Sequence, residues 1–116
     1  MWERLQEVFE EIGLPYSRQG TYGVDETLPD SFFTFWNKDS EFEAWYNNKP
    51  HKCVWTWNVF FYTNDPELIY SKLDEFIEKA MEKGFQVLGR GKDLSTDEPN
   101  YYSRYVEISF IENLQQ

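Results

Sequence analysis

Two residues with side chains able to do nucleophilic chemistry stand close together in HKCVWTWNVFFYTND, residues 51–65. His51 and Cys53 are the chain's one histidine and one cysteine, and side chains two positions apart on a strand share a face. A reactive thiol needs a neighbouring base and electropositive surroundings that lower its pKa. The local charge balance is acidic, and Cys53 begins an apolar strand face, where cysteine behaves as a small buried hydrophobe. We therefore interpret Cys53 as structural, and one His with one Cys is too few ligands for a zinc site.

Carboxylates are numerous, and a pair of them could serve as the acid and base of a glycosidase. They avoid the apolar stripes of two predicted helices. Asp74 and Glu78 stand four residues apart, as do Glu75 and Lys79, which is ordinary spacing for an exposed helix surface. Because no spacing singles out one pair, we expect a solvated acidic face rather than a catalytic site.

The segment GRG, residues 89–91, is a single G-x-G after a short predicted strand. A dinucleotide-binding loop needs a third glycine and a following helix, and the next residues, KDLSTDEPN, supply neither. The sequence therefore predicts a mobile polar loop over 89–100.

Aromatic residues beside a turn give function another candidate position. Trp45 and Tyr46 precede NNKP, residues 47–50, in which Asn tolerates left-handed backbone angles and Pro50 cannot donate to a strand ladder. A long hairpin here would extend past the core of so small a domain. Exposed aromatics on a protruding element are good interface anchors, whereas packing on the outer end of the sheet is the structural alternative. The sequence leaves both open.

Apolar periodicity predicts the elements that position these residues. Three- and four-residue spacing predicts a helix over 2–12, ended by Gly13, and a longer helix capped by Asn64 or Asp65 and ended by Gly84. Residues 16–30 are predicted to form a long connection. The predicted strands are SFFTFW (31–36), EFEAWY (41–46), the aromatic part of 51–65, FQVLG (85–89) and YYSRYVEISFIE (101–112). The order α-β-β-β-α-β-β predicts one domain over 1–116, of α+β class, with helices on one face of a mainly antiparallel sheet.

One face of the strand in 51–65 is wholly apolar and the other is mixed, as in a central antiparallel strand covered by a helix. The predicted core combines this face with stripes of the second helix and the last strand. Its central members are Trp55, Trp57, Val59, Phe61, Leu73, Phe76, Ile77, Val106 and Ile108. Leu68, Ile69, Ala80 and Met81 complete the helical stripe, and Tyr102 and Phe110 complete the strand face, which Arg104 interrupts.

Composition narrows the class of protein. Aromatic residues make up 20% of 116 residues, which suffices for a core without disulfides, because each ring can bury about 150–250 Å². With 21 acidic and 11 basic residues the net charge is −10, so the surface repels nucleic acid. No apolar run approaches the roughly 20 residues of a membrane helix. One cysteine and no secretory signal predict a reducing, intracellular setting.

Several short motifs occur in a recognisable order along the chain. They are Gly13-Leu14-Pro15, Pro29 with Phe32 and Phe33, Tyr46-Asn47-Asn48-Lys49, the strand CVWTWNVFFYT, Asp65-Pro66-Glu67 and the final strand YYSRYVEISFIE. In this order they resemble the small tail-completion proteins, of the tail-terminator type, from siphophages and Gram-positive prophages. The resemblance spans nearly the whole chain and departs from the family pattern at Pro50-His51.

The resemblance implies a ring, commonly a hexamer, at the head-proximal end of a phage tail tube, where it stops tube polymerisation and joins the head connector. Such proteins are not enzymes and need no cofactor. The implied partners are further copies of the chain, tail-tube protein and head-connector protein, first in the bacterial host cytoplasm and then in the virion tail. Our hypothesis places the assembly contacts on the hairpin 37–50, the loop 89–100 and strand edges. The candidate contact residues are Trp45, Tyr46, Asn47, Asn48, Lys49, Arg90, Lys92 and Asp93.

The acidic charge fits a ring through which DNA slides, because six copies of −10 total −60 and would repel phosphates wherever they line the lumen. Two alternatives stay open: a related head-completion protein, and an intracellular binding or regulatory module with an aromatic groove for a peptide or small ligand. A deep aromatic pocket beside Trp55 or Trp57 would favour the module, and unusually fast alkylation of Cys53 would favour an enzyme.

Overall fold

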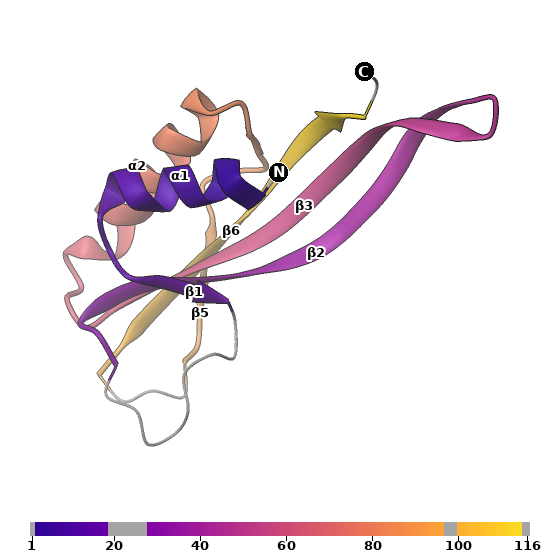
Figure 1. Ribbon diagram of the computed structural model, residues 1–116. Helices are drawn as coiled ribbons and strands as arrows, with labels where there is room; N and C mark the ends of the chain where they lie inside the picture. Colours follow the sequence, from indigo (N-terminus) through magenta and orange to yellow (C-terminus); the bar gives the residue numbers. More distant parts are fainter. Residues whose placement is uncertain (1, 19–27, 97–99, 115–116) are drawn as a thin grey trace.

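The computed structural model describes residues 2–18, 28–96 and 100–114, which form two helices and a six-stranded sheet (Figure 1). The elements are α1 (Trp2–Ile12), β1 (Tyr16–Arg18), β2 (Ser31–Tyr46), β3 (Lys49–Thr63), α2 (Leu68–Glu82), β4 (Gln86–Val87), β5 (Lys92–Leu94) and β6 (Tyr102–Asn113). The strand order is β1-β2-β3-β6-β4, with β5 also paired to β6. β1 lies parallel to β2, and the other pairs are antiparallel. Both helices cover the same face of the sheet, so the predicted α+β class is confirmed.

Helix α1 has the predicted bounds because its apolar stripe packs on the sheet. Leu5, Val8 and Phe9 are fully buried, and the ring of Phe9 lies 5.4 Å from that of Phe33 on β2. Gly13 ends the helix with φ 84°, a left-handed angle that glycine adopts without strain, and its N–H donates to the Phe9 carbonyl at 3.1 Å. Neither helix in the described residues is long and apolar enough to cross a membrane.

The prediction that Asn64 or Asp65 caps α2 is wrong, because the helix begins at Leu68 and Glu67 occupies the cap position. The carboxylate of Asp65 accepts the N–H of Glu67 at 3.0 Å, and its carbonyl accepts the N–H of Leu68 at 3.0 Å. These bonds form a separate turn before the helix. An Asp side chain that bonds two residues ahead makes such a turn as readily as a helix cap.

Gly84 ends helix α2 as predicted. The Phe85 N–H donates to the Ala80 carbonyl and the Gly84 N–H to the Met81 carbonyl, with Gly84 at φ 94°, which is the Schellman arrangement. Met81 itself is 55% exposed, so its assignment to the buried stripe is wrong. Its neighbour Ala80 takes the buried position.

Strand β2 runs unbroken through the two predicted strands 31–36 and 41–46, which corrects the prediction of separate elements. The pairing register with β3 shifts between Asn37 and Asp39, so a bulge replaces the expected break. The Asn37 side-chain amide donates to the carbonyls of Asp39 and Thr56 at 3.0 and 3.1 Å. A residue type that favours turns therefore holds the bulge together instead of ending the strand.

β3 is the central strand, paired with β2 on one edge and β6 on the other. Its helix-facing side chains alternate as predicted, with Cys53, Trp57, Val59 and Phe61 buried and Trp55 packed at the border of the core. The core also contains the other residues predicted for it: Leu73, Phe76, Ile77, Val106 and Ile108.

Two short strands lie in segments predicted to be connections. β1 adds a parallel edge beside residues 33–35 of β2, and β5 pairs with β6 inside the predicted 89–100 loop. Strands of three residues depend on their partners rather than on a local pattern. Gly91 precedes β5 at φ 94°, and a Cβ there would lie 2.6 Å from the Tyr105 carbonyl oxygen. Residues 97–99 of the predicted loop and 19–27 of the predicted connection lie outside the described residues.

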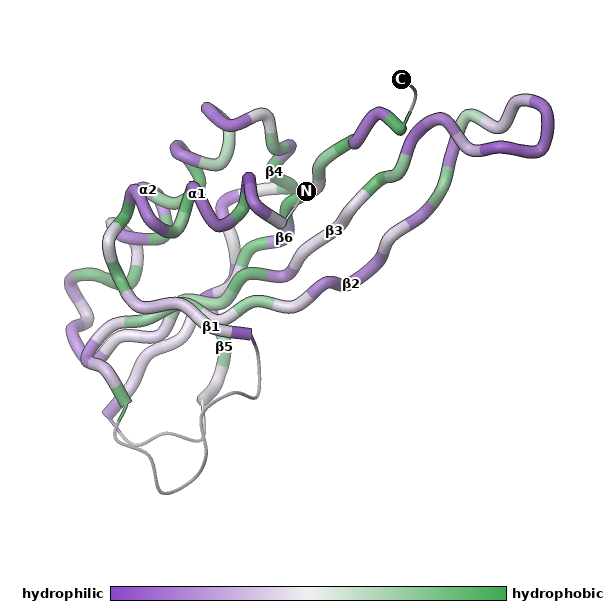
Figure 2. The backbone as a smooth tube through the Cα atoms, viewed as in Figure 1, coloured by the Kyte–Doolittle hydropathy of each residue, from purple (hydrophilic) through white to green (hydrophobic). Residues whose placement is uncertain are grey.

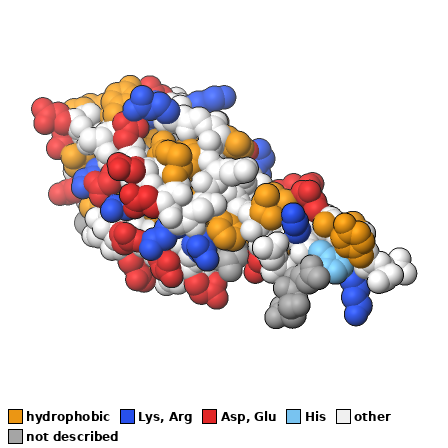
Figure 3. Space-filling model, turned by 90° about the horizontal axis from the view of Figure 1, so that it is seen from above, with side chains coloured by type: hydrophobic (Ala, Val, Ile, Leu, Met, Phe, Trp, Pro, Cys, Tyr) orange, Lys and Arg blue, Asp and Glu red, His pale blue; other side chains and the backbone are white. Residues whose placement is uncertain are grey.

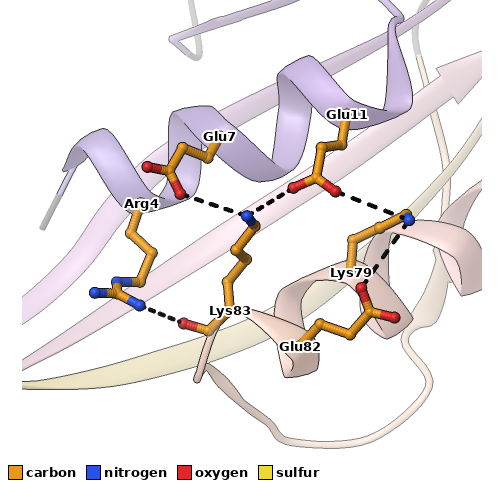
Figure 4. A network of polar contacts seen from close by, with 6 residues as sticks. All are labelled: Arg4, Glu7, Glu11, Lys79, Glu82 and Lys83. Atoms are coloured by element: carbon orange, nitrogen blue, oxygen red, sulfur yellow. Dashed lines mark hydrogen bonds and ion pairs between the residues drawn. The ribbon is translucent and has the colours of Figure 1, made fainter.

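An ionic network joins α1 to the end of α2 (Figure 4). The Lys83 ammonium lies 2.9 Å from a Glu11 carboxylate oxygen and 3.6 Å from one of Glu7. The hydrogen bond from Lys83 lowers the pKa of the Glu11 carboxyl and raises the pKa of Lys83. Arg4 donates to the Lys83 carbonyl at 3.0 Å, where the helix ends. The network therefore fixes the N-terminal helix against the second helix as well as against the sheet.

Candidate functional site: the β2–β3 arm

The hairpin of β2 and β3 projects beyond the body of the molecule (Figure 1). We call its projecting part, residues 38–54, the arm. Every β2 residue in the arm is exposed. The molecule measures 54 Å along its longest axis and 28 and 22 Å across, and the arm accounts for this elongation. The predicted long hairpin is therefore present.

A two-residue turn closes the arm. Asn47 and Asn48 have φ angles of 52° and 62°, and Tyr46 pairs with Lys49. Two successive left-handed residues give the type I′ turn, whose twist matches that of the flanking strands. Pro50, predicted as part of the turn, already lies in β3 opposite Trp45. The turn is hydrophilic, as Figure 2 shows.

Exposed aromatic side chains lie just behind the turn. Phe42, Trp45 and Tyr46 are 55%, 58% and 65% exposed, so they do not pack on the end of the sheet. The rings of Phe42 and Trp45 meet edge to face at 6.1 Å, and Tyr46 meets His51 in the same way at 5.0 Å. The rings thus form two small clusters presented to solvent, which is the arrangement of an interface anchor.

Ala44 adds backbone strain to this region. Its φ is 56°, in the left-handed region, which costs an L-residue about 1 kcal/mol. The angle interrupts the regular alternation of side chains between Phe42 and Trp45. Strain kept at a non-glycine residue is typical of functional positions.

Charge changes along the molecule toward the end of the arm. We call residues 44–52 the tip. The tip contains Lys49 and Lys52 and no acidic residue, so its formal charge is +2. The rest of the chain therefore carries −12, which gives the net charge of −10. Neither lysine makes an ion pair with the described residues. In Figure 3 acidic side chains are spread over the body and the start of the arm, whereas hydrophobic, histidine and lysine side chains are visible toward its far end.

The outer edge of β2 is open along the arm. β1 covers this edge at residues 33–35, and no described strand pairs with it from Trp36 to Tyr46. A strand edge of this length presents a row of backbone donors and acceptors that a further strand can pair with. The arm therefore offers both backbone and aromatic contacts.

The thiol considered at the start lies at the base of the arm. Cys53 is 4% exposed and pairs across the sheet with Phe42 and Glu112. Burial, and secondarily the Glu112 carboxylate, raises the pKa of the Cys53 thiol. The same carboxylate accepts a hydrogen bond from the Trp55 indole at 3.0 Å. This environment favours the protonated thiol, which is the poorer nucleophile.

The other predicted contact residues lie on the body, away from the tip (Figure 1). Arg90, Lys92 and Asp93 flank the β4–β5 turn and are exposed. Arg90 pairs with Asp74 at 2.9 Å, and Asp93 pairs with Arg104 at 2.6 Å. The structure does not bring the two predicted halves of the assembly surface together.

A second exposed apolar surface was missed by sequence reasoning. Tyr70, Leu94 and Tyr102 surround a hollow of about 410 Å³, so the prediction that Tyr102 belongs to the buried strand face is wrong. Arg104 holds this surface together, with its guanidinium 4.8 Å from the Tyr70 ring centre and donating to the Gly91 carbonyl at 3.1 Å. The sequence signal for this surface was Arg104, the charged residue that interrupts the apolar face of the last strand.

Comparison with known proteins leaves the family open. No protein-family model and no curated protein sequence matches this chain.

Proposed function

We propose that this protein is a non-enzymatic assembly protein of the tail-terminator type. It forms a homo-oligomeric ring at the head-proximal end of a phage tail tube, ends tube polymerisation there and joins the head connector. The observation that carries the proposal is the arm, because its exposed aromatic rings and open strand edge leave apolar surface and backbone groups uncovered in a monomer.

The size of the aromatic surface sets what the arm does in assembly. Three rings of about 150–250 Å² each, slightly more than half exposed, offer roughly 300–400 Å². A stable interface buries about 800 Å² on each partner. The rings of the arm therefore anchor a contact whose remaining area comes from the open β2 edge and the body, and each subunit must use two different surfaces for a ring to close.

Charge supports the passage of DNA. A ring of subunits that each carry −10 has no electrostatic means of gripping a duplex, because gripping requires cations that neutralise phosphates. The lysines of the tip engage a protein neighbour in this proposal.

The alternative of an aromatic groove receives no support from the positions of the tryptophans. The rings of Trp55 and Trp57 stack at 6.2 Å, and Trp2 and Phe35 pack against Trp57 at 6.1 and 6.0 Å. Protein side chains thus occupy the place where this alternative would put a ligand.

Electron microscopy of the purified chain tests the proposal. We expect closed rings with a central opening, and binding of these rings to the ends of tail-tube assemblies. Particles that stay monomeric at high concentration and do not associate with tail-tube protein would remove the basis of the proposal. The genes beside the coding sequence give an independent check, since capsid, connector and tail-tube genes fit the proposal and metabolic genes contradict it.

A further inference from the structure

The sheet has an open edge at each end. The outer edge of β2 has no partner among the described strands from Trp36 to Tyr46, and β5 pairs with β6 alone among them. The two strands lie at opposite ends of the order β2-β3-β6-β5. Because each edge leaves backbone donors and acceptors unpaired, the sheet of one copy can continue into the next through these two edges.

The β2 edge carries negative charge. Asp39, Glu41 and Glu43 are exposed and lie on the same side of the strand. None of the three makes an ion pair with the described residues. The carboxylate of Asp39, and less strongly that of Glu43, raises the pKa of the Glu41 carboxyl. A cation brought to this edge therefore relieves a repulsion that the monomer leaves in place.

A second β2 edge is a poor partner for this one. Pairing of two copies about a twofold axis through Glu41 would place Glu41 opposite itself and Asp39 opposite Glu43. Like charges directly opposite each other destabilise a strand pair. Charged side chains along an open edge are a common protection against such self-pairing, so the partner of the β2 edge must be a different strand.

β5 supplies a cation at the other end of the sheet. Lys92 is exposed and makes no ion pair with the described residues. Arg104 holds β5 in place, because it pairs with Asp93 at 2.6 Å and donates to the Gly91 carbonyl at 3.1 Å. Arg90, just before β5, is already paired with Asp74 at 2.9 Å. Lys92 is therefore the cation that this edge can offer to a neighbour.

Glu41 and Lys92 lie on the same face of the sheet. Glu41 is opposite Val54 on β3, and Lys92 is opposite Tyr105 on β6. Val54 and Tyr105 both alternate with buried neighbours that face the helices. Since successive side chains on a strand point to opposite faces, Glu41 and Lys92 both lie on the face away from the helices.

We propose that β2 of one copy pairs with β5 of the next copy, with Lys92 opposite Glu41. The proposal deepens the ring assembly and rests on it. A rotation about an axis along the strands keeps strand direction, and β2 and β5 run in opposite directions within one copy, so the new pair is antiparallel. A register that keeps the helices of both copies on one side places Lys92 opposite one of the three edge carboxylates, of which Glu41 is the central one. Asp93 then lies opposite Ser40, so no two carboxylates face each other.

The regular part of the β2 edge suits the short length of β5. A bulge precedes Asp39, and Ala44 has a left-handed φ of 56°. Gly91, directly before β5, has φ 94°. Backbone pairing is therefore confined to residues 39–43 of β2 and 92–94 of β5, and the rings of the arm supply the remaining contact.

Exchange of the two charges tests the pairing by sedimentation velocity. Lys92→Glu and Glu41→Lys should each weaken self-association about three- to tenfold in about 0.1 M salt, because like charges then lie opposite each other. The combined variant Lys92→Glu with Glu41→Lys should assemble like the wild type, since it restores the pair in the reverse sense. The matched control, Lys92→Glu with Glu78→Lys, has the same net charge but places the added cation on α2, so it should stay weakened. Circular dichroism confirms that each variant is folded.

Disulfide cross-linking tests the register. The variant Ser40→Cys with Asp93→Cys should form a ladder of cross-linked subunits under mild oxidation, because side chains directly opposite each other on paired strands lie about 4.5–5.5 Å apart. Ser40→Cys alone should give no cross-link, since one β2 edge does not meet another. The native Cys53 is buried and should add no link of its own.

The outcomes separate the pairing from the ring assembly. Single reversals that leave assembly unchanged, a combined variant no better than its control, or a double-cysteine variant without cross-links overturn the pairing while leaving the ring assembly intact. Cross-linked dimers of the Ser40→Cys chain would overturn it in favour of a twofold contact between β2 edges. A wild-type chain that is monomeric overturns the ring assembly, and the pairing with it.

Discussion

The replacement Trp57→Ala tests whether the stretch 51–65 serves as the core strand. Trp57 is 3% exposed and packs against Trp2, Phe35 and Trp55. Burial of about 200 Å² of ring at about 25 cal/mol per Å² corresponds to about 5 kcal/mol, and measured costs of such truncations are about 3–5 kcal/mol. Since a domain of this size is stabilised by only about 5–15 kcal/mol, the variant should be close to unfolding.

Trp45→Ala is the matched control, because it removes the same side chain from the same hairpin at a 58% exposed position. We expect a change within about 0.5 kcal/mol there. Urea denaturation followed by circular dichroism gives both values, and the melting temperature should fall by more than about 10 °C for Trp57→Ala. A stable Trp57→Ala protein, or a Trp45→Ala protein destabilised as strongly, would refute the assignment of core and arm.

The replacement Trp57→Phe separates packing from polarity. The Trp57 indole nitrogen is buried without a hydrogen-bond partner among the described residues, and an unsatisfied buried donor costs about 1–3 kcal/mol. Phe removes that donor together with part of the ring, so the loss of unfolding free energy should be well below that of Ala. Equal losses of unfolding free energy in the two variants would show that the buried indole N–H does not destabilise the folded protein.

Three further predictions concern single side chains. Because the pKa of Glu11 is lowered in the folded state, Glu11→Gln should lower the melting temperature at pH 7, and this difference should vanish as the pH falls below about 4. The control Glu10→Gln removes no ion pair to a described residue and should show no such pH-dependent loss. Ala44→Gly should raise the free energy of unfolding by about 0.5–1 kcal/mol by relieving the left-handed strain, and a loss in urea denaturation would contradict the φ of 56°. Cys53 in the native protein should react with iodoacetamide at least tenfold more slowly than in the unfolded chain. A faster reaction would favour a catalytic role for the Cys53 thiol.

Local sequence patterns predicted the elements that bury one continuous apolar face against the core. The stripe of α1 and the alternation along β3 are strong because each buries a full side against the same core. Asn37 misled the prediction, since a turn-forming residue can hold a bulge when a neighbouring strand supplies a carbonyl. β1 and β5 could not be predicted, because three residues gain their pairing from strands far along the chain.

The candidate site was predictable in part for the same reason. Trp45 and Tyr46 stand beside a turn motif that a single sequence reveals. Glu3 and Glu7 of α1 lie beside the end of β6, more than 100 residues away, and only the packing of α1 across the sheet brings them together. The exposure of Met81 and Tyr102 could not be predicted from the sequence either, because periodicity assigns a residue to a face and does not show where the element covering that face ends.

The mass of the assembled particle tests the central claim most directly. Sedimentation equilibrium should give a multiple of the 14.1 kDa chain for the wild type and for the body variant Leu88→Ala, whose side chain is also exposed. The double variant Trp45→Ala with Tyr46→Ala should shift toward 14.1 kDa, because truncation of an anchor residue weakens association by about 2 kcal/mol or more, roughly thirtyfold. A double variant that keeps the wild-type mass would contradict the account of the arm as the assembly surface.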